Sequence, residues 1–302
     1  MTERRMAERR ITDGLLGLIV ELENDPTLQL PHRVRLRIEA LDRLDAYLLM
    51  EEYPSHGLHS GDSEVFERAR ALSAMLEAAN GKLYQAVRDQ IQRGDGCGLL
   101  LEAIGQQDPV NEAGRCVRGD SYDYLDELVG GVLRLEKPEA EVSLLEKEMV
   151  RYQPTPARHM MDLIFQAALT EKDVLIDLGS GMGHVPILAG VCSYAQCIGV
   201  ELEAAYVHCA RLSAKALGLG KVSFIQQDAR VADLSAGTVF YLYTPFTGSI
   251  LRSVLDSLCK AAANRETRVC TFGPCAAILA REPWLKSAET PAVDRITVFS
   301  SR

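Results

Sequence analysis

Three acidic residues follow apolar segments at a spacing that could create a binding site for a cationic ligand. Asp177 ends the run Val-Leu-Ile-Asp, Glu201 ends the run Ile-Gly-Val-Glu, and Asp228 follows a third expected strand in Gln-Gln-Asp-Ala. One such acid alone is equally consistent with a solvated charge at the end of a strand. If the three runs are neighbouring parallel strands, however, their carboxyl ends meet at the edge of the sheet where ligands bind. Carboxylates at that edge attract positive charge.

A glycine-rich loop lies between the first two acids. Gly179, Gly181 and Gly183 alternate with other residues, and Pro186 follows in the first turn of an expected helix, a position that proline favours. Glycine lets the backbone turn sharply and approach a ligand closely, and the helix start offers free N–H groups. Dinucleotide-binding loops place the third glycine five positions after the first, whereas here it comes four after. A P-loop is excluded because no Gly-Lys-Ser/Thr follows.

This loop and its acids resemble those of class I methyltransferases, which use S-adenosyl-L-methionine. The resemblance implies that Glu201 accepts the ribose hydroxyls, since an ionised carboxylate is an acceptor only, and that Asp228 receives the adenine amino group. An acidic pocket also suits the cationic sulfonium and ammonium groups of this cofactor. The residues expected to bind it are Asp177, Gly179, Ser180, Gly181, Gly183, Glu201, Asp228, Ala229 and Thr155.

Two further segments could position the group that receives the methyl. Tyr152-Gln-Pro-Thr155 precedes the glycine loop, and we expect Thr155 to cap a helix that has Pro156 in its first turn. Tyr243-Thr-Pro-Phe246 follows the expected fourth strand. An aromatic channel would lower the pKa of a lysine by desolvation and so expose its lone pair. The candidate catalytic residues are Tyr152, Tyr243, Thr244 and Phe246. A strand exit packed against helices is the alternative for the second segment.

Residues 150–275 resemble the non-SET histone-lysine methyltransferases, the disruptor-of-telomeric-silencing family. The shared features are the tyrosine at 152, Asp-Leu-Gly-Ser-Gly at 177–181, Gly-Val-Glu at 199–201 and the aromatic segment at 243–248. The paired asparagines of that family are replaced here by Tyr243 and Thr244, and the acidic residue of its lid loop is absent. The form Tyr-x-Pro-Thr is more similar to seven-strand enzymes that methylate lysines of non-histone proteins. The resemblance therefore extends to the cofactor site and not to the substrate.

Hydrophobic periodicity predicts the elements that must position these residues. Residues 1–150 carry apolar stripes at helical spacing and predict an all-α domain, with breaks at 57–62, 93–98 and 105–121. We expect this domain to recognise substrate, act as a lid or mediate oligomerisation. Residues 151–302 alternate strands with helices and predict an α/β, Rossmann-like seven-strand methyltransferase sheet, mostly parallel, with a closing antiparallel hairpin. The expected strands are 174–178, 197–201, 222–226, 238–243, 268–273, 285–289 and 295–300.

Composition and charge narrow the possible partners. No run approaches about 18 apolar residues, so we expect no membrane span, and the N-terminus is a poor secretory signal. Eight scattered cysteines without a Cys-x-x-Cys pair predict free thiols in the cytoplasm. No metal site is expected, because His56 and His59 have no further ligands nearby in sequence. Residues 1–150 carry a net charge of −11 and residues 151–302 of +2, which disfavours a nucleic-acid partner.

Three functions are consistent with this sequence. The first is N-methylation of a protein lysine, with the acidic run between residues 120 and 148 attracting a basic protein; a solvated helix face is the alternative for that run. The second is O-, N- or C-methylation of a small molecule. The third is a non-catalytic regulatory protein that binds the cofactor. Fold alone does not separate the three.

Overall fold

The computed structural model describes residues 3–51, 60–105, 119, 122–135, 138, 147–263 and 265–302. It divides into two compact units, Met1–Val87 with Leu99–Asn111, and Arg88–Gly98 with Glu112–Arg302. The second unit thus includes residues N-terminal to the expected boundary at 150. The His56/His59 pair, Cys116 and most of the acidic run lie outside the described residues.

The first unit is helical, as the stripes predict. Its elements are α1 (Glu3–Glu23), η1 (Pro26–Gln29), η2 (Pro31–Arg33), α2 (Val34–Glu51) and α3 (Ser60–Gln92), followed by α4 (Gly98–Gly105). The apolar stripes over residues 65–79 and 83–91 belong to the single helix α3, which has 33 residues. Fully buried side chains from three of these helices, among them Leu15, Leu44 and Phe66, form its core. The short helix α4 was not predicted, because it begins inside the glycine-containing break at 93–98.

One polar side chain is completely buried in this helical core. The guanidinium of Arg37 on α2 donates hydrogen bonds to Asn80 Oδ1 on α3 (2.6 Å), to Leu28 O (3.0 Å), to Leu30 O (2.6 Å) and to Pro31 O (3.1 Å). Three of these acceptors are backbone carbonyls of the segment between α1 and α2, which contains the short helices η1 and η2. Arg37 therefore ties this segment to α2 and α3.

The second unit contains the predicted seven-strand sheet. Its strands are β1 (Val174–Leu178), β2 (Gln196–Glu201), β3 (Val222–Gln226), β4 (Val239–Leu242), β5 (Arg268–Thr271), β6 (Leu285–Ser287) and β7 (Thr297–Ser301). The strand order is β3-β2-β1-β4-β5-β7-β6. Strands β1 to β5 are parallel, whereas β7 is antiparallel to both β5 and β6. The expected Rossmann-like fold with a closing antiparallel hairpin is confirmed.

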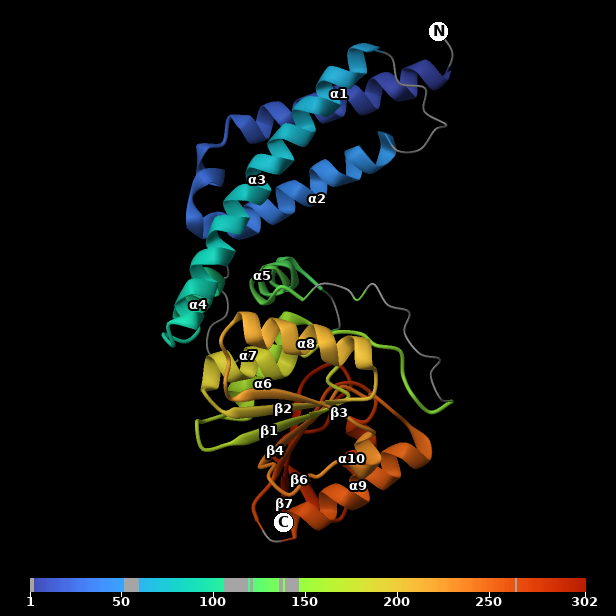
Figure 1. Cartoon of the computed structure of the whole chain (residues 1–302). Helices are drawn as coiled ribbons and strands as arrows, with labels where there is room; N and C mark the ends of the chain where they lie inside the picture. Colours follow the sequence, from blue (N-terminus) through green and yellow to red (C-terminus); the bar gives the residue numbers. More distant parts are fainter. Residues whose placement is uncertain are drawn as a thin grey trace. The chain divides into compact units, whose positions relative to one another are not determined.

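Helices cover both faces of this sheet (Figure 1). On one face lie α6 (Ala157–Gln166), α7 (His184–Ser193) and α8 (Ala204–Ala216), and on the other α9 (Gly248–Ala262) and α10 (Ala276–Leu279). The unit also contains α5 (Tyr124–Leu133) and η3 (Ala229–Val231). Apolar side chains of α9, including Leu251 and Leu255, pack on Ile176 and Phe240 of the central strands. Burial on both faces explains why these strands are continuous apolar runs.

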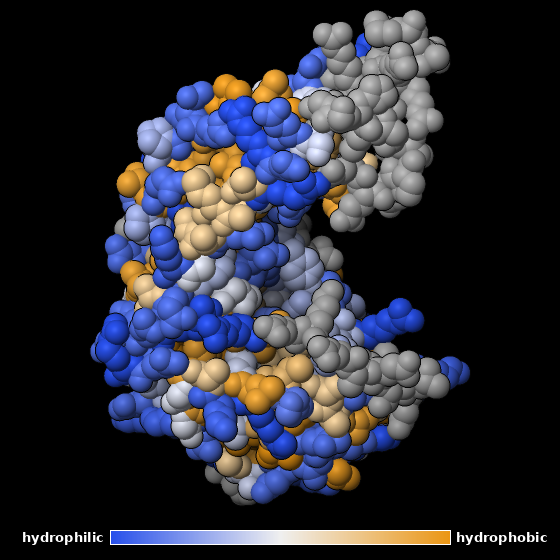
Figure 2. Space-filling model, turned by 45° about the horizontal axis from the view of Figure 1, so that its top comes forward, coloured by the Kyte–Doolittle hydropathy of each residue, from blue (hydrophilic) through white to orange (hydrophobic). Residues whose placement is uncertain are grey.

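The described surface is largely polar. Figure 2 shows hydrophobic residues interspersed among hydrophilic ones on the face that it presents, as is normal for exposed apolar residues. None of the helices in the described ranges is both long and apolar enough to cross a membrane. Seven cysteines in these ranges have free thiols, four of them buried.

Candidate active site

The glycine loop connects β1 to α7 by a turn that only glycine adopts readily. Gly179, Gly181 and Gly183 have φ angles of +85°, +52° and +85°, and L-residues rarely occupy this left-handed region. A Cβ on Gly181 would lie 2.0 Å from the ring of Tyr152, and one on Gly183 would lie 2.5 Å from the ring of Phe224. Each glycine is thus required by its backbone conformation and by close packing.

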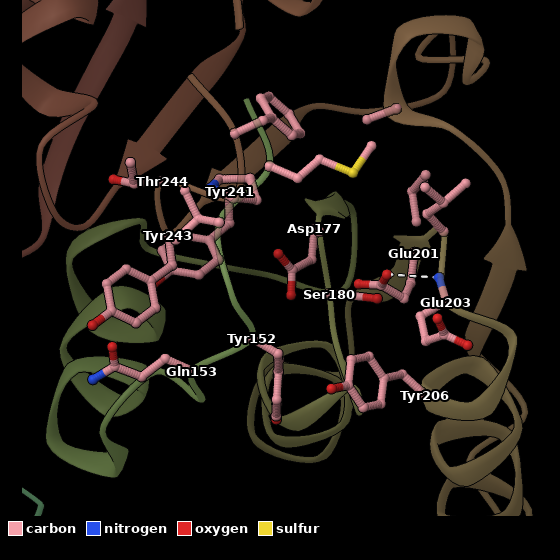
Figure 3. A pocket seen from close by; sticks show the side chains of 18 of the residues that line it. Tyr152, Gln153, Asp177, Ser180, Glu201, Glu203, Tyr206, Tyr241, Tyr243 and Thr244 are labelled. Carbon is pink, nitrogen blue, oxygen red and sulfur yellow. Dashed lines mark hydrogen bonds between the residues drawn. The ribbon is translucent and has the colours of Figure 1, made fainter. Parts of the chain in front are cut away.

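The three predicted acids line one cavity of about 1240 Å³ at the carboxyl ends of β1, β2 and β3. Figure 3 shows the carboxylates of Asp177 and Glu201 directed into it from neighbouring strands. Of the loop, Gly179 and Ser180 line the cavity, whereas Gly181 and Gly183 are not among its lining residues. The three acids therefore share one cavity, whereas Gly181 and Gly183 shape the loop without lining the cavity.

Asp177 is buried, and its pKa is raised well above the ordinary range of an aspartic acid. Loss of hydration on burial is the main cause, and the negative charge of Glu201 adds to it. A cation bound in the cavity would favour the ionised carboxylate and reverse this shift. The site therefore has an acid whose charge is best stabilised by a positively charged ligand.

The pH dependence of cofactor affinity tests this role of Asp177. Binding of a cationic ligand lowers the pKa of the carboxyl, so affinity is full above the pKa of the ligand-free protein and falls as the pH drops through it, by up to about tenfold per pH unit. We expect calorimetric titration of S-adenosylhomocysteine, which retains the ammonium group, to show this loss. Asp177→Asn should bind weakly at every pH. An equal pH slope in the wild type and the variant would contradict the role.

Glu201 is held in place by two backbone N–H groups. Its Oε2 accepts a hydrogen bond from Gly181 N (2.8 Å), and its Oε1 accepts one from Glu203 N (2.9 Å). Each carboxylate oxygen keeps a further lone pair. The side chain is therefore fixed against the glycine loop and still able to accept hydrogen bonds from two ligand hydroxyls.

Asp228 lines the cavity, but its carboxylate already pairs with Arg230. The ion pair measures 2.6 Å between Asp228 Oδ2 and Arg230 Nη2, and Asp228 Oδ1 accepts from Arg230 N at 2.8 Å. These contacts lower the pKa of Asp228. An adenine amino group would have to share this carboxylate with the guanidinium. Arg230 was not among the predicted site residues, although an Asp-x-Arg spacing at a turn is a local signal for such a pair.

Ser180 supplies a polar group without a partner. Its Oγ is buried and has no hydrogen-bond partner within the described part of the chain, although buried hydroxyls are normally satisfied. A ligand in the cavity that Ser180 lines can provide the missing hydrogen bond. Together with the buried acid Asp177 and the acceptor Glu201, this hydroxyl fits S-adenosylmethionine, which is cationic and carries ribose hydroxyls.

A segment that we call the strap, residues 148–155, forms one wall of the cavity. Seven consecutive residues of it, Met149–Thr155, line the cavity. The ring of Tyr152 covers Gly181 and lies 4.8 Å from the ring of Tyr206. Its hydroxyl is 3.1 Å from Nδ1 of His184. Burial lowers the pKa of His184 to about 4, so this imidazole is neutral at neutral pH.

The expected cap of α6 by Thr155 is wrong. Helix α6 begins at Ala157 with Pro156 as its N-cap and no side-chain hydrogen bond. The Thr155 hydroxyl lies instead 2.9 Å from the hydroxyl of Tyr241, a buried cavity residue that the sequence analysis missed. The Thr155 hydroxyl thus pairs with Tyr241 on β4 and does not form the helix cap that the Thr-Pro dipeptide predicts.

The segment after β4 lies at the cavity as predicted, and its residues have different surroundings. Tyr243 packs against Phe272, with ring centroids 4.7 Å apart. Thr244 has a φ of +42°, and its hydroxyl donates to Phe272 O (3.0 Å) and accepts from Cys275 N (3.2 Å). Phe246 is buried in the core against α9. All three of these residues line the cavity, and Thr244 and Phe246 are also held by contacts in the interior.

Comparison with known proteins agrees with this arrangement. The profile of the family described as Histone methylation protein DOT1 matches residues 150–220. This span includes the strap from Val150 onward, the glycine loop and Glu201. No curated protein matches the chain.

Several solved methyltransferase structures are similar to part of this chain. An RNA methyltransferase from Salinibacter ruber in complex with S-adenosyl-L-homocysteine is 28% identical, with 49% of this chain and 92% of that chain covered and a TM-score of 0.40. Precorrin-6y C5,15-methyltransferase from Geobacter metallireducens is 13% identical, with coverage of 51% and 92% and a TM-score of 0.40. TYW2 from M. jannaschii in complex with AdoMet is 13% identical, with coverage of 50% and 77% and a TM-score of 0.38.

The family match and the cavity together identify the cofactor that this site binds. The glycine loop, the acids at three strand ends and the seven-strand order all agree with that match. The sheet-containing part of the chain is therefore an S-adenosylmethionine-dependent methyltransferase of class I that resembles the DOT1 family.

Proposed function

We propose that this chain methylates the side-chain amine of a lysine in a protein substrate. The observation that supports this most is the cavity beyond the cofactor acids. In the view of Figure 3, Tyr243 and Gln153 lie on the side of Asp177 opposite to Glu201, and all four residues line the same cavity. An aromatic wall at that end favours a neutral amine, because desolvation lowers the pKa of a lysine.

The charges of the cavity agree with a basic substrate. Among the described residues that line it, the carboxylates are Asp177, Glu201, Glu203 and Asp228, and the only arginine is Arg151. Such a lining attracts an approaching ammonium group and repels phosphates. It favours a protein lysine over a nucleic acid, which binds through basic surfaces.

The chain's own residues would position the reactants. S-adenosylmethionine, when bound, supplies an activated methyl group to a nucleophile with a free lone pair. Glu201, Ser180 and Tyr243 line the cavity. In this proposal Glu201 and Ser180 hold the cofactor, and Tyr243 aligns the amine and excludes water. Alignment and exclusion of water are the contributions that a displacement reaction needs from the protein. The free cysteines support a cytoplasmic setting for this activity.

Transfer of tritiated methyl groups from S-adenosylmethionine into fractionated host lysate tests the proposal. We expect label in protein, and acid hydrolysis should release it as methylated lysine. Asp177→Asn serves as the matched inactive control. Label confined to RNA or to small metabolites would contradict a protein-lysine substrate.

A small-molecule acceptor is the second candidate, and the size of the cavity favours it. Its volume of about 1240 Å³ exceeds the roughly 300–1,000 Å³ of typical ligand pockets. A second small molecule therefore has room beside the cofactor. Label in the metabolite fraction of the same experiment would identify this function.

Substitutions of Tyr243 test the acceptor end separately from the cofactor end. Tyr243→Ala removes the aromatic wall, and we expect kcat/KM for the labelled acceptor to fall about 10- to 100-fold because the nucleophile is no longer aligned. The dissociation constant for S-adenosylhomocysteine should stay within about twofold of the wild type. Tyr243→Phe keeps the ring and is the matched control. An equal loss of cofactor affinity in Tyr243→Ala would show that this residue does not act on the acceptor.

A further inference from the structure

The strap is joined at its N-terminal end to the loop that follows β4. Thr247 N donates to Glu148 O (2.8 Å), and Val150 N donates to Pro245 O (3.0 Å). Met149 and Phe246 form an antiparallel bridge between these bonds. This short pairing marks the point where the strap begins to line the cavity.

The side chain of Glu148 fastens this junction to the start of α9. Its Oε2 accepts from Ser249 Oγ (2.7 Å) and from Ile250 N (3.1 Å), and these bonds lower its pKa. A carboxylate is favourable at the N-terminus of a helix, where free N–H groups and the positive end of the dipole lie. Gly248, at φ +56°, makes room for it, since a Cβ there would lie 2.3 Å from Glu148 Oε1.

Two other contacts hold the strap further along. The Tyr152 hydroxyl pairs with His184 over the glycine loop, and the Thr155 hydroxyl pairs with Tyr241 in the interior. The bond between Glu148 and Ser249 is exposed, whereas the bond between Thr155 and Tyr241 is buried. The N-terminal fastening is therefore the one most open to competition from water.

We propose that Glu148 is a positioning residue for the cofactor. Its carboxylate keeps the strap paired with the β4 exit, and the paired strap holds the ring of Tyr152 against Gly181, which in turn donates to Glu201. The wall of the cavity is then formed before the cofactor arrives. This role rests on the assignment of the cavity to S-adenosylmethionine and is independent of the identity of the acceptor.

The expected consequence of losing Glu148 is weaker cofactor binding through a loosened strap. Loss of a hydrogen bond to a charged group lowers the ratio of fastened to loosened strap about tenfold, and the apparent dissociation constant rises by at most the same factor, about tenfold. We therefore expect Glu148→Ala to bind S-adenosylhomocysteine about tenfold more weakly in calorimetry. Glu148→Gln, which keeps one acceptor oxygen, should lie between this variant and the wild type.

Hydrogen–deuterium exchange of peptides covering the strap distinguishes this role from a general loss of stability. In Glu148→Ala the strap should exchange faster, while peptides from β1 and β4 keep their protection. Glu171→Ala removes an exposed carboxylate from the turn before β1 and is the matched control, with affinity and exchange unchanged. The proposal is supported if the strap exchanges faster and S-adenosylhomocysteine binds more weakly in Glu148→Ala but not in Glu171→Ala.

Three results would overturn it. An unchanged affinity in Glu148→Ala would show that the strap does not need this fastening, while the methyltransferase assignment would stand. Weaker binding without faster exchange of the strap would show that Glu148 acts by another route. Failure of the wild-type chain to bind S-adenosylhomocysteine would remove both the cofactor assignment and this role.

Discussion

Gly181→Arg is expected to abolish cofactor binding, with at least a 100-fold increase in the dissociation constant for S-adenosylhomocysteine. The new Cβ would lie 2.0 Å from the ring of Tyr152, so the ring or the loop must move. The loop cannot move alone, because the N–H of Gly181 is bonded to Glu201. The substitution therefore disturbs the strap, the glycine loop and the expected ribose acceptor together. Isothermal titration calorimetry measures the loss.

Gly218→Arg is the matched control for backbone strain. Gly218 also has a positive φ, +69°, but no atom lies within 4 Å of a Cβ built there. Both variants should lose about 1–2 kcal/mol of stability from the left-handed conformation, and only Gly181→Arg should lose cofactor binding. Cofactor binding by Gly181→Arg at wild-type strength would place the cofactor elsewhere in the molecule.

Arg37→Ala is expected to lower the free energy of unfolding of the helical unit by about 3–4 kcal/mol. The substitution removes the guanidinium donor from the side chain of Asn80 and from three backbone carbonyls, and a buried polar group that loses a partner is costly. The loss is a large part of the stability of a typical domain. Far-UV circular dichroism during urea unfolding should show an earlier helical transition.

The second unit provides an internal reference for this measurement. Trp284 is the only tryptophan of the chain and lies in the second unit, so its fluorescence should report an unchanged transition. Arg43→Ala is the matched control, because Arg43 forms an exposed ion pair with Glu21, and such surface pairs contribute little to stability. Equal effects of the two substitutions would contradict the role assigned to Arg37.

The sheet could be predicted from sequence because its signal is local. Strand β1 has the predicted bounds, because a central parallel strand must be apolar on both faces and its run is bounded by turn residues. Strand β3 also has the predicted bounds, although it lies at the edge of the sheet and buries only two of its five residues. The acids at the strand ends followed from the same reasoning, because parallel strands bring their carboxyl ends to one edge. Position along the chain was enough to predict which edge these residues occupy.

Other features depend on partners that are distant in sequence. Tyr241 lies between core residues on β4, and nothing in the neighbouring sequence distinguishes it as a cavity residue. Its hydroxyl pairs with that of Thr155, which lies 86 positions away. The prediction that Thr155 caps α6 was wrong because the same distant contact with Tyr241 engages its hydroxyl. Arg37 lies beside the apolar stripe of α2, where a charge usually faces solvent, and only the packed turns supply its acceptors. Such contacts are set by tertiary packing, which periodicity does not encode.

The cavity wall formed by Met149–Thr155 differs from the sheet in how its residues are distributed along the chain. The sheet and its covering helices depend on long-range pairing, so a change there affects the whole unit. The wall is one contiguous stretch outside the sheet, carrying exposed side chains such as Arg151 and Gln153. The exposed side chains of Arg151 and Gln153 could therefore be exchanged to alter the shape and charge of this wall, while Tyr152 and Thr155 keep their contacts with the glycine loop and β4.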